Sequence, residues 1–199
     1  MAALGGMLLP GVVWGHHFME DQLPQSFAQG LLSGLGHPVI GVDHLAFIVA
    51  TGFLLGLVKH GVWGVIAFTS GSLLGAALHL TGFGLAGGEM LVALSLILIG
   101  GVILSGHRVP LAWLAGGLIL AGIFHGHAYA ESIFGAEPMP LGGYLMGFCF
   151  VQLGIGMAAL VLHRRLLAMG AHRARPISST LGAVVGAVGV VFLASAAAS

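Results

Sequence analysis

Long apolar segments separated by short polar connections run through most of the chain. Six of these segments have close to the twenty residues that a helix needs to cross a hydrocarbon core of about 30 Å. They are Gly41–Val58, Val62–Leu80, Glu89–Ser105, Pro110–Tyr129, Leu141–His163 and Ile177–Ala198. The connections are too short to hold a soluble domain. The pattern therefore predicts an all-α, polytopic membrane helix bundle with about six transmembrane helices, which occupies residues 37–199 as one domain.

The N-terminal region, residues 1–36, is less regular. Met1–Val13 is apolar like the central region of a signal peptide, but no Lys or Arg precedes it and no clear cleavage site follows. Cleavage and retention of this segment both stay open. A polar linker containing His16 and His17 comes next. The apolar stretch Ser26–Leu35 is too short to span a bilayer, so we expect an interfacial or partly inserted helix that stops before Pro38.

Composition narrows the class further. Hydrophobic residues make up 58% of the 199 residues and charged residues only 6%, against about 25% in soluble domains. The formal net charge is zero, which gives nucleic acid no basic surface to bind. The 35 glycines include pairs at i and i+4, a spacing that brings membrane helices into close contact and could also pack copies of the chain into a homo-oligomer. These pairs are Gly52/Gly56, Gly71/Gly75, Gly143/Gly147 and Gly182/Gly186.

All six cationic side chains fall on alternate connections: Lys59, Arg108, Arg164, Arg165, Arg173 and Arg175. The positive-inside rule places these connections in the cytoplasm and both termini on the extracytoplasmic side. The aromatic residues agree with this orientation, because Trp and Tyr are enriched at the two membrane interfaces. We expect Trp63 and Trp113 at inner ends of the spans and Tyr129 and Tyr144 at outer ends.

Histidines and carboxylates gather at the outer ends of the predicted spans, where no cation is available to pair with them. The histidines are His37, His44, His79, His125 and His127, and the carboxylates are Asp43, Glu89, Glu131 and Glu137. Four other histidines, at positions 60, 107, 163 and 172, lie at inner ends and are interpreted as interfacial polar residues. Ionisable groups that converge inside a membrane protein usually serve transport or catalysis. The alternative is that they only hydrogen-bond one another across helices.

Imidazole and carboxylate together form the ligand set of a borderline divalent transition metal. His127 and Glu131, four residues apart, share a helix face, whereas His125 points roughly the other way. Gly126 could relax the helix so that both rings turn inward, or one ring could be a ligand and the other could orient it. His37 precedes Pro38 and Gly41, in backbone that need not be helical. The candidate metal ligands are His37, Asp43, His44, His79, His125, His127 and Glu131.

Two motifs in this chain resemble the HupE/UreJ family of nickel and cobalt permeases. One combines His37-Pro38, Gly41 and Asp43-His44, and the other is Phe124-His125-Gly126 followed by Ala128. The resemblance continues through Gly135-Ala136-Glu137 and the order of six spans. It implies secondary uptake of Ni²⁺ or Co²⁺ across the bacterial cytoplasmic membrane, with the ion as cargo and no prosthetic group. Ala130 departs from the family, since many members have glycine there, and this puts the role of Glu131 in doubt.

Other function classes remain to be weighed. A membrane-embedded metal-dependent enzyme could use the same side chains, although it would need an open coordination position and the sequence offers no further nucleophile. A subunit that assembles a metalloenzyme is a second alternative. A retinal protein is excluded because Lys59, at a helix end, is the only lysine. The chain has no phosphate-binding loop, so we expect that it does not hydrolyse ATP. With transport as the favoured interpretation, we expect that it is not an enzyme.

Overall fold

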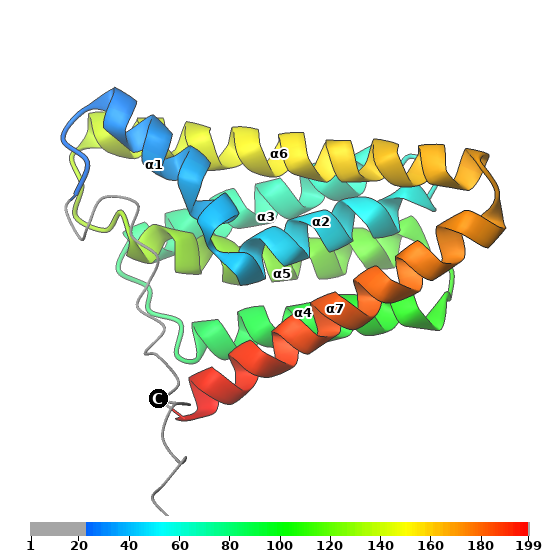
Figure 1. Ribbon diagram of the computed structural model, residues 1–199. Helices are drawn as coiled ribbons and strands as arrows, with labels where there is room; N and C mark the ends of the chain where they lie inside the picture. Colours follow the sequence, from blue (N-terminus) through cyan, green and yellow to red (C-terminus); the bar gives the residue numbers. More distant parts are fainter. Residues whose placement is uncertain (1–22, 199) are drawn as a thin grey trace, which may run out of the picture.

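The computed structural model describes residues 23–198, which fold into helices without strands (Figure 1). The helices of this part are α1 (Phe27–Ile40), α2 (Val42–Gly56), α3 (Val62–Leu80), α4 (Gly88–Ser105), α5 (Leu111–Glu131), α6 (Pro138–Ala168) and α7 (Ala171–Ala198). The predicted all-α membrane bundle is thus confirmed. The signal-like segment and the pair His16-His17 lie outside the described residues.

Helices α3 to α7 are each long and apolar enough to cross a membrane. Helix α2 has 15 residues and a length of about 22 Å, which falls short of the hydrocarbon core. Helices α1 and α2 pass the same test only as a pair, and they meet at an angle of 77°. The prediction of one continuous span at 41–58 is therefore wrong. If the pair α1 and α2 is counted as one span, that span is a broken helix that begins at Phe27 and brings the number of candidate spans to six.

The break in this span lies at Gly41 and not at Pro38. Helix α1 continues through Pro38 to Ile40, so the expected stop before Pro38 is wrong and His37 lies in a regular helix. Proline removes one hydrogen-bond donor from a helix, yet α1 stays helical there, with Pro38 buried and the helix packed along α6. Gly41 has φ −68° and ψ 100°, its N–H donates to His37 O, and its own carbonyl accepts from the N–H of Leu45.

Glycine contacts hold the main helix pairs together, as the spacing of the glycines predicted. Gly75 of α3 faces Ile123 O of α5, and a Cβ there would overlap that carbonyl. Gly34 of α1 lies against Tyr144 O of α6 in the same way, and Gly100 of α4 meets α7. Seven of the eight glycines in the pairs singled out in the sequence make such contacts within the chain, and Gly186 is the exception, since a Cβ there would meet nothing within 4 Å. These glycines therefore serve helix packing within the chain, and packing of copies through other glycine faces stays a prediction.

The bundle has two chemically different ends. The six cationic side chains lie in or beside the connections α2–α3, α4–α5 and α6–α7, which we term the basic end. At the opposite end, which we term the acidic end, Glu89 begins α4, Glu131 ends α5 and Glu137 precedes α6. In Figure 1 the acidic end is on the left and the basic end on the right. Between the ends, large apolar side chains such as Leu98, Phe150 and Val191 are exposed, a surface suited to lipid.

Three residues that were assigned to the membrane interface lie in the core instead. Tyr129 and Tyr144 are fully buried among the helices, so they do not belong to an aromatic belt. His163 is buried as well: its Nδ1 contacts Phe53 O, and its ring stacks on Phe53 with centroids 3.9 Å apart. Its Nε2 lies 3.2 Å from Ser178 Oγ of α7. These side chains are buried because each finds a hydrogen-bond partner on a neighbouring helix, which sequence position alone does not reveal.

Candidate metal centre

The candidate ligands separate into two groups at the acidic end of the bundle. The first, which we term the deep group, contains His37 of α1, His44 of α2 and His125 of α5, and all three rings are buried. The second, the rim group, contains His79 of α3 with His127 and Glu131 of α5. Helix α5 runs without interruption through Gly126, so its two histidines face different neighbours. The sequence had left open whether one or both would be used in a single cluster.

The centre of the deep group is the pair His44 and His125. Their Nδ1 atoms lie 2.9 Å apart, although 81 residues separate them in the chain. His125 is completely buried, six residues or about 9 Å before the end of α5. The rings of Phe47 and Phe68 pack against it, with centroid distances of 4.5 and 5.6 Å. Two imidazole nitrogens thus face each other in an apolar surround.

Hydrogen bonds determine which nitrogen of His125 carries the proton. Its Nε2 lies 3.0 Å from Ser95 Oγ, and that hydroxyl donates to Val92 O at 2.6 Å. Because the single hydroxyl proton is used there, the Nε2–H of His125 donates to Ser95. The Nδ1 of His125 is then unprotonated, with its lone pair directed at His44. Metal-binding histidines are held in this way, with the other ring nitrogen donating to a fixed acceptor.

His37 is oriented by the same kind of arrangement. Its Nδ1 is 2.9 Å from Tyr144 Oη and 3.1 Å from Ser132 Oγ. Both hydroxyls donate to Tyr129 O, at 2.7 and 2.9 Å, so they can only accept from the imidazole. His37 therefore carries its proton on Nδ1, and its Nε2 is left as the basic nitrogen. The ring lies 5.8 Å from that of His44 by centroids.

Asp43 lies beside the deep group in the first turn of α2. Its Oδ1 accepts the N–H of His44 at 2.8 Å, and the side chain is half-buried. The helix N-terminus favours the negative charge, since the macrodipole is positive there. The side chains of Asp43 and His44 lie close to the backbone of Gly41. A Cβ on Gly41 would be 2.8 Å from His44 Cδ2 and 3.3 Å from Asp43 Oδ1. The break in the span therefore positions the carboxylate and the imidazole together.

A strip of buried polar side chains continues from the deep group toward the basic end. Gln152 of α6 donates from Nε2 to Tyr129 Oη at 3.3 Å and to Ser72 Oγ at 3.2 Å. Its Oε1 has no partner among the described residues, and the same is true of Thr51 Oγ1 on α2. A buried polar atom without a hydrogen bond costs about 1–3 kcal/mol. An ordered water or an ion is the usual partner of such an atom in the interior of a protein.

The rim group is built around His127, whose residue is 3% exposed. Its Nε2 accepts the backbone N–H of Leu85 at 3.1 Å. The same nitrogen lies 3.1 Å from His79 Nδ1 and 3.0 Å from Phe83 O. On the other side of the ring, Nδ1 is 3.8 Å from Glu131 Oε1. The expected shared face of His127 and Glu131 is confirmed. One ligand atom from each of the three residues lies within 4.8 Å of the others.

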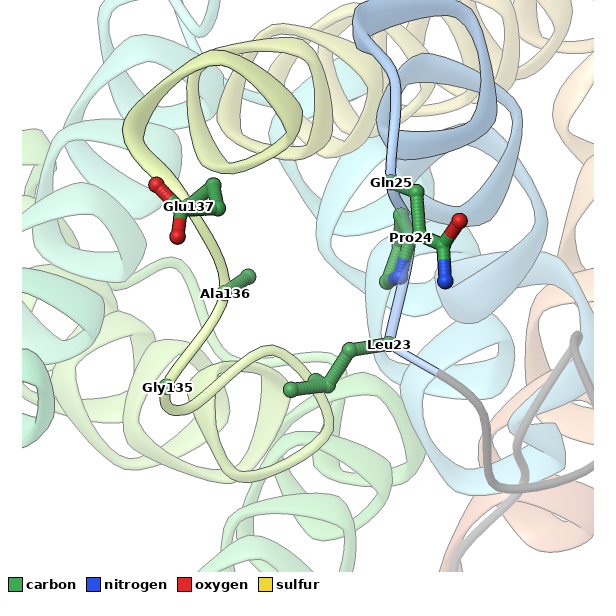
Figure 2. A pocket seen from close by; sticks show the side chains of 6 residues that line it. All are labelled: Leu23, Pro24, Gln25, Gly135, Ala136 and Glu137. Atoms are coloured by element: carbon green, nitrogen blue, oxygen red, sulfur yellow. The ribbon is translucent and has the colours of Figure 1, made fainter.

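The acidic end also carries a pocket of about 410 Å³ between the chain preceding α1 and the α5–α6 connection (Figure 2). Leu23 points across its opening toward Gly135. The lining contains one carboxylate, that of Glu137, and no histidine. A transition metal needs several donors, so this pocket does not provide the ligand set that the deep and rim groups offer.

Comparison with known proteins identifies the family of this chain. A family model described as HupE / UreJ protein matches residues 4–192. The chain belongs to the HupE/UreJ family. Protein HupE of Rhizobium leguminosarum bv. viciae is 29% identical over 164 residues, which cover 79% of this chain and 81% of that protein. No solved structure matches the chain. The family is related to nickel and cobalt transport, so this HupE/UreJ chain is a membrane protein of a metal-transport family.

Sequence reasoning about this HupE/UreJ chain identified the histidines but missed the side chains that orient them. Tyr144, Ser132 and Ser95 fix the rings of His37 and His125, and Tyr129 packs against His44 with centroids 4.4 Å apart. One signal was available: Tyr129 follows His125 by four residues and so shares its helix face. Ser95 and Tyr144 carry no such signal, because only the packing of α4 and α6 brings them to the site.

Proposed function

We propose that this HupE/UreJ protein carries Ni²⁺ or Co²⁺ through the membrane by secondary transport, and that the deep group with Asp43 binds the ion. The supporting observation is the separation of 2.9 Å between the Nδ1 atoms of His44 and His125. Two nitrogens bonded to one ion at about 2.0–2.1 Å and at a right angle lie about 2.9 Å apart. Right angles between ligands are typical of square-planar and octahedral sites, and Ni²⁺ adopts square-planar nitrogen sites.

Charge also supports a cation at this position. Asp43 has no Lys or Arg within reach, because all six cationic side chains lie at the basic end. A carboxylate costs about 2.5–3.5 kcal/mol at the centre of a membrane helix, and less toward an interface. A divalent ion between Asp43 and the neutral imidazoles compensates for that cost. His37, whose Nε2 is the basic nitrogen, would contribute the fourth donor.

A broken helix beside a buried site is a common plan for secondary transporters. The break at Gly41 places the N-terminus of α2 at the deep group. The polar strip of Gln152, Ser72 and Thr51 then provides a path toward the basic end between α2, α3 and α6. The positive-inside rule places the basic end in the cytoplasm, so the direction of transport is uptake through the bacterial inner membrane, with the C-terminus outside.

Proteoliposomes that contain a metal-sensing dye test the proposal. We expect saturable entry of Ni²⁺ or Co²⁺ in the wild type and a loss of at least tenfold in His125→Ala. Asp43→Asn keeps the shape of the side chain and removes its charge, so it should cause a similar loss. His172→Ala, an exposed histidine at the basic end, is the matched control and should transport normally. Entry that survives both site substitutions would refute this site. Tight binding without any entry would instead indicate an enzyme or an assembly subunit.

A further inference from the structure

The rim group has the chemistry of a metal site but is separate from the deep group. Its three donors are two imidazoles and one carboxylate, a set that suits borderline divalent ions. His127 lies two residues after His125 on α5, about 3 Å further along the axis and about 200° around it. The two rings therefore lie on different sides of the helix. One ion cannot be bound by both groups at once.

His127 is prepared for binding by its surroundings. Its Nδ1 is buried and has no hydrogen-bond partner in the described part of the chain. Its Nε2 accepts the backbone N–H of Leu85 at 3.1 Å, so the proton of the neutral ring is on Nδ1 and faces Glu131. Binding of a metal at Nδ1 would move that proton to Nε2, which can donate it to Phe83 O at 3.0 Å. Donation of one ring nitrogen to a backbone carbonyl is the usual support for a metal-binding histidine. The distance of 3.8 Å from Nδ1 to Oε1 is too long for a hydrogen bond.

The distance of 3.8 Å between His127 Nδ1 and Glu131 Oε1 leaves room for an ion. Two ligands at about 2.0–2.2 Å from a metal can be up to about 4.2 Å apart. The three rim atoms span up to 4.8 Å, so they need to approach by several tenths of an ångström. Glu131 can make that movement because its side chain is 57% exposed, and His79 is only half-buried. No cationic side chain at the acidic end competes for the carboxylate.

We propose that His79, His127 and Glu131 bind a second divalent transition-metal ion, and that this rim site captures the ion before it reaches the deep group. Binding at the rim follows from the geometry alone, whereas its role as a loading site rests on the proposed transport function. Glu131 is exposed and His125 is buried, so an ion arriving at the acidic end meets the rim group first. The rim site then raises the rate at which the deep group fills at low metal concentration.

The number of bound ions tests the proposal. We would equilibrate the full-length protein in detergent with Co²⁺ at pH 7.5 and measure ions per chain by mass spectrometry of the metal. The wild type should bind two. Glu131→Gln and His79→Ala should each bind one, and His125→Ala should lose the other. His107→Ala, an exposed histidine at the basic end, should keep two. Glu131 is a surface residue, so its variant should fold, and the ion retained in the deep group reports that it has done so.

Uptake by the same variants measures the loading role. Glu131→Gln and His79→Ala should raise the KM for Co²⁺ entry at least fivefold and leave the maximal rate within twofold of the wild type. His125→Ala should lower the maximal rate. Rim variants that bind as many ions as the wild type would overturn the rim site. If rim variants lose their ion while His125→Ala keeps full binding and entry, the rim site stands and the deep group is refuted.

Discussion

His125 and His127 are two residues apart on α5, yet their rings belong to different groups. His125 meets His44 and Ser95 inside the bundle, whereas His127 meets His79, from α3, nearer the acidic end. A regular helix separates the directions of residues i and i+2 by about 200°, which explains this divergence. The two histidines of this short motif therefore face two different groups of side chains instead of one.

Ser95 positions His125, so its removal should weaken metal binding without unfolding the protein. In Ser95→Ala the Nε2–H of His125 loses its acceptor, and the ring can take the wrong tautomer. Loss of such a partner typically lowers metal affinity 10–100-fold. Titration with Ni²⁺ measures this change. Ser105→Ala is the matched control on the same helix, because Ser105 makes an equivalent bond to Val102 O far from the site. Equal affinities for the two variants would contradict the assigned role.

Gly41 is required for the close approach of α1 and α2. In Gly41→Ala the new methyl group would lie 2.8 Å from His44 Cδ2, so the ring must move away from His125. We expect Ni²⁺ affinity to fall at least tenfold while the helix content measured by circular dichroism is unchanged. Gly154→Ala serves as control, since a Cβ on that residue of α6 meets open space. Normal affinity in Gly41→Ala would mean that the break in the span does not position the site.

Gly126 should be essential for stability rather than for metal chemistry. A Cβ at this position would overlap the backbone of Ser72, where α3 and α5 pack together. Overpacking of this kind costs about 1–3 kcal/mol, and more where backbone must move. Gly126→Ala should therefore lower the thermal midpoint in detergent by several degrees or prevent folding. Gly116→Ala, also on α5 but without neighbours within 4 Å, should not lower it.

Metal binding should weaken in acid. Imidazole must be neutral to bind a metal, and an unperturbed histidine titrates near pH 6.5, so protons compete with the ion below that pH. Affinity is then highest above pH 7 and falls as the pH is lowered. We expect at least a tenfold loss between pH 7.5 and 5.5, measured by titration with Co²⁺. The same affinity at both values would exclude histidine as a main ligand.

The identity of the candidate ligands could be read from the sequence because their chemistry is unusual in a membrane segment. His37, Asp43, His44 and His125 were each found by their cost in an apolar environment and by their common end of the spans. The division of the candidate ligands into a deep group and a rim group could not be predicted from the sequence. Spacing gives the direction of a side chain on its own helix, but it does not say which helix lies opposite.

Sequence alone determined the class, the end of the bundle that carries the candidate ligands, and the family. Those features follow from hydropathy, charge and local motifs, which are properties of single segments. Tertiary structure decided the rest: a broken first span at Gly41, the contact of His44 with His125, and the burial of Tyr129 and Tyr144. Each depends on which surfaces of distant helices meet. That choice is made by close glycine packing and by the need of buried polar groups for partners from other helices.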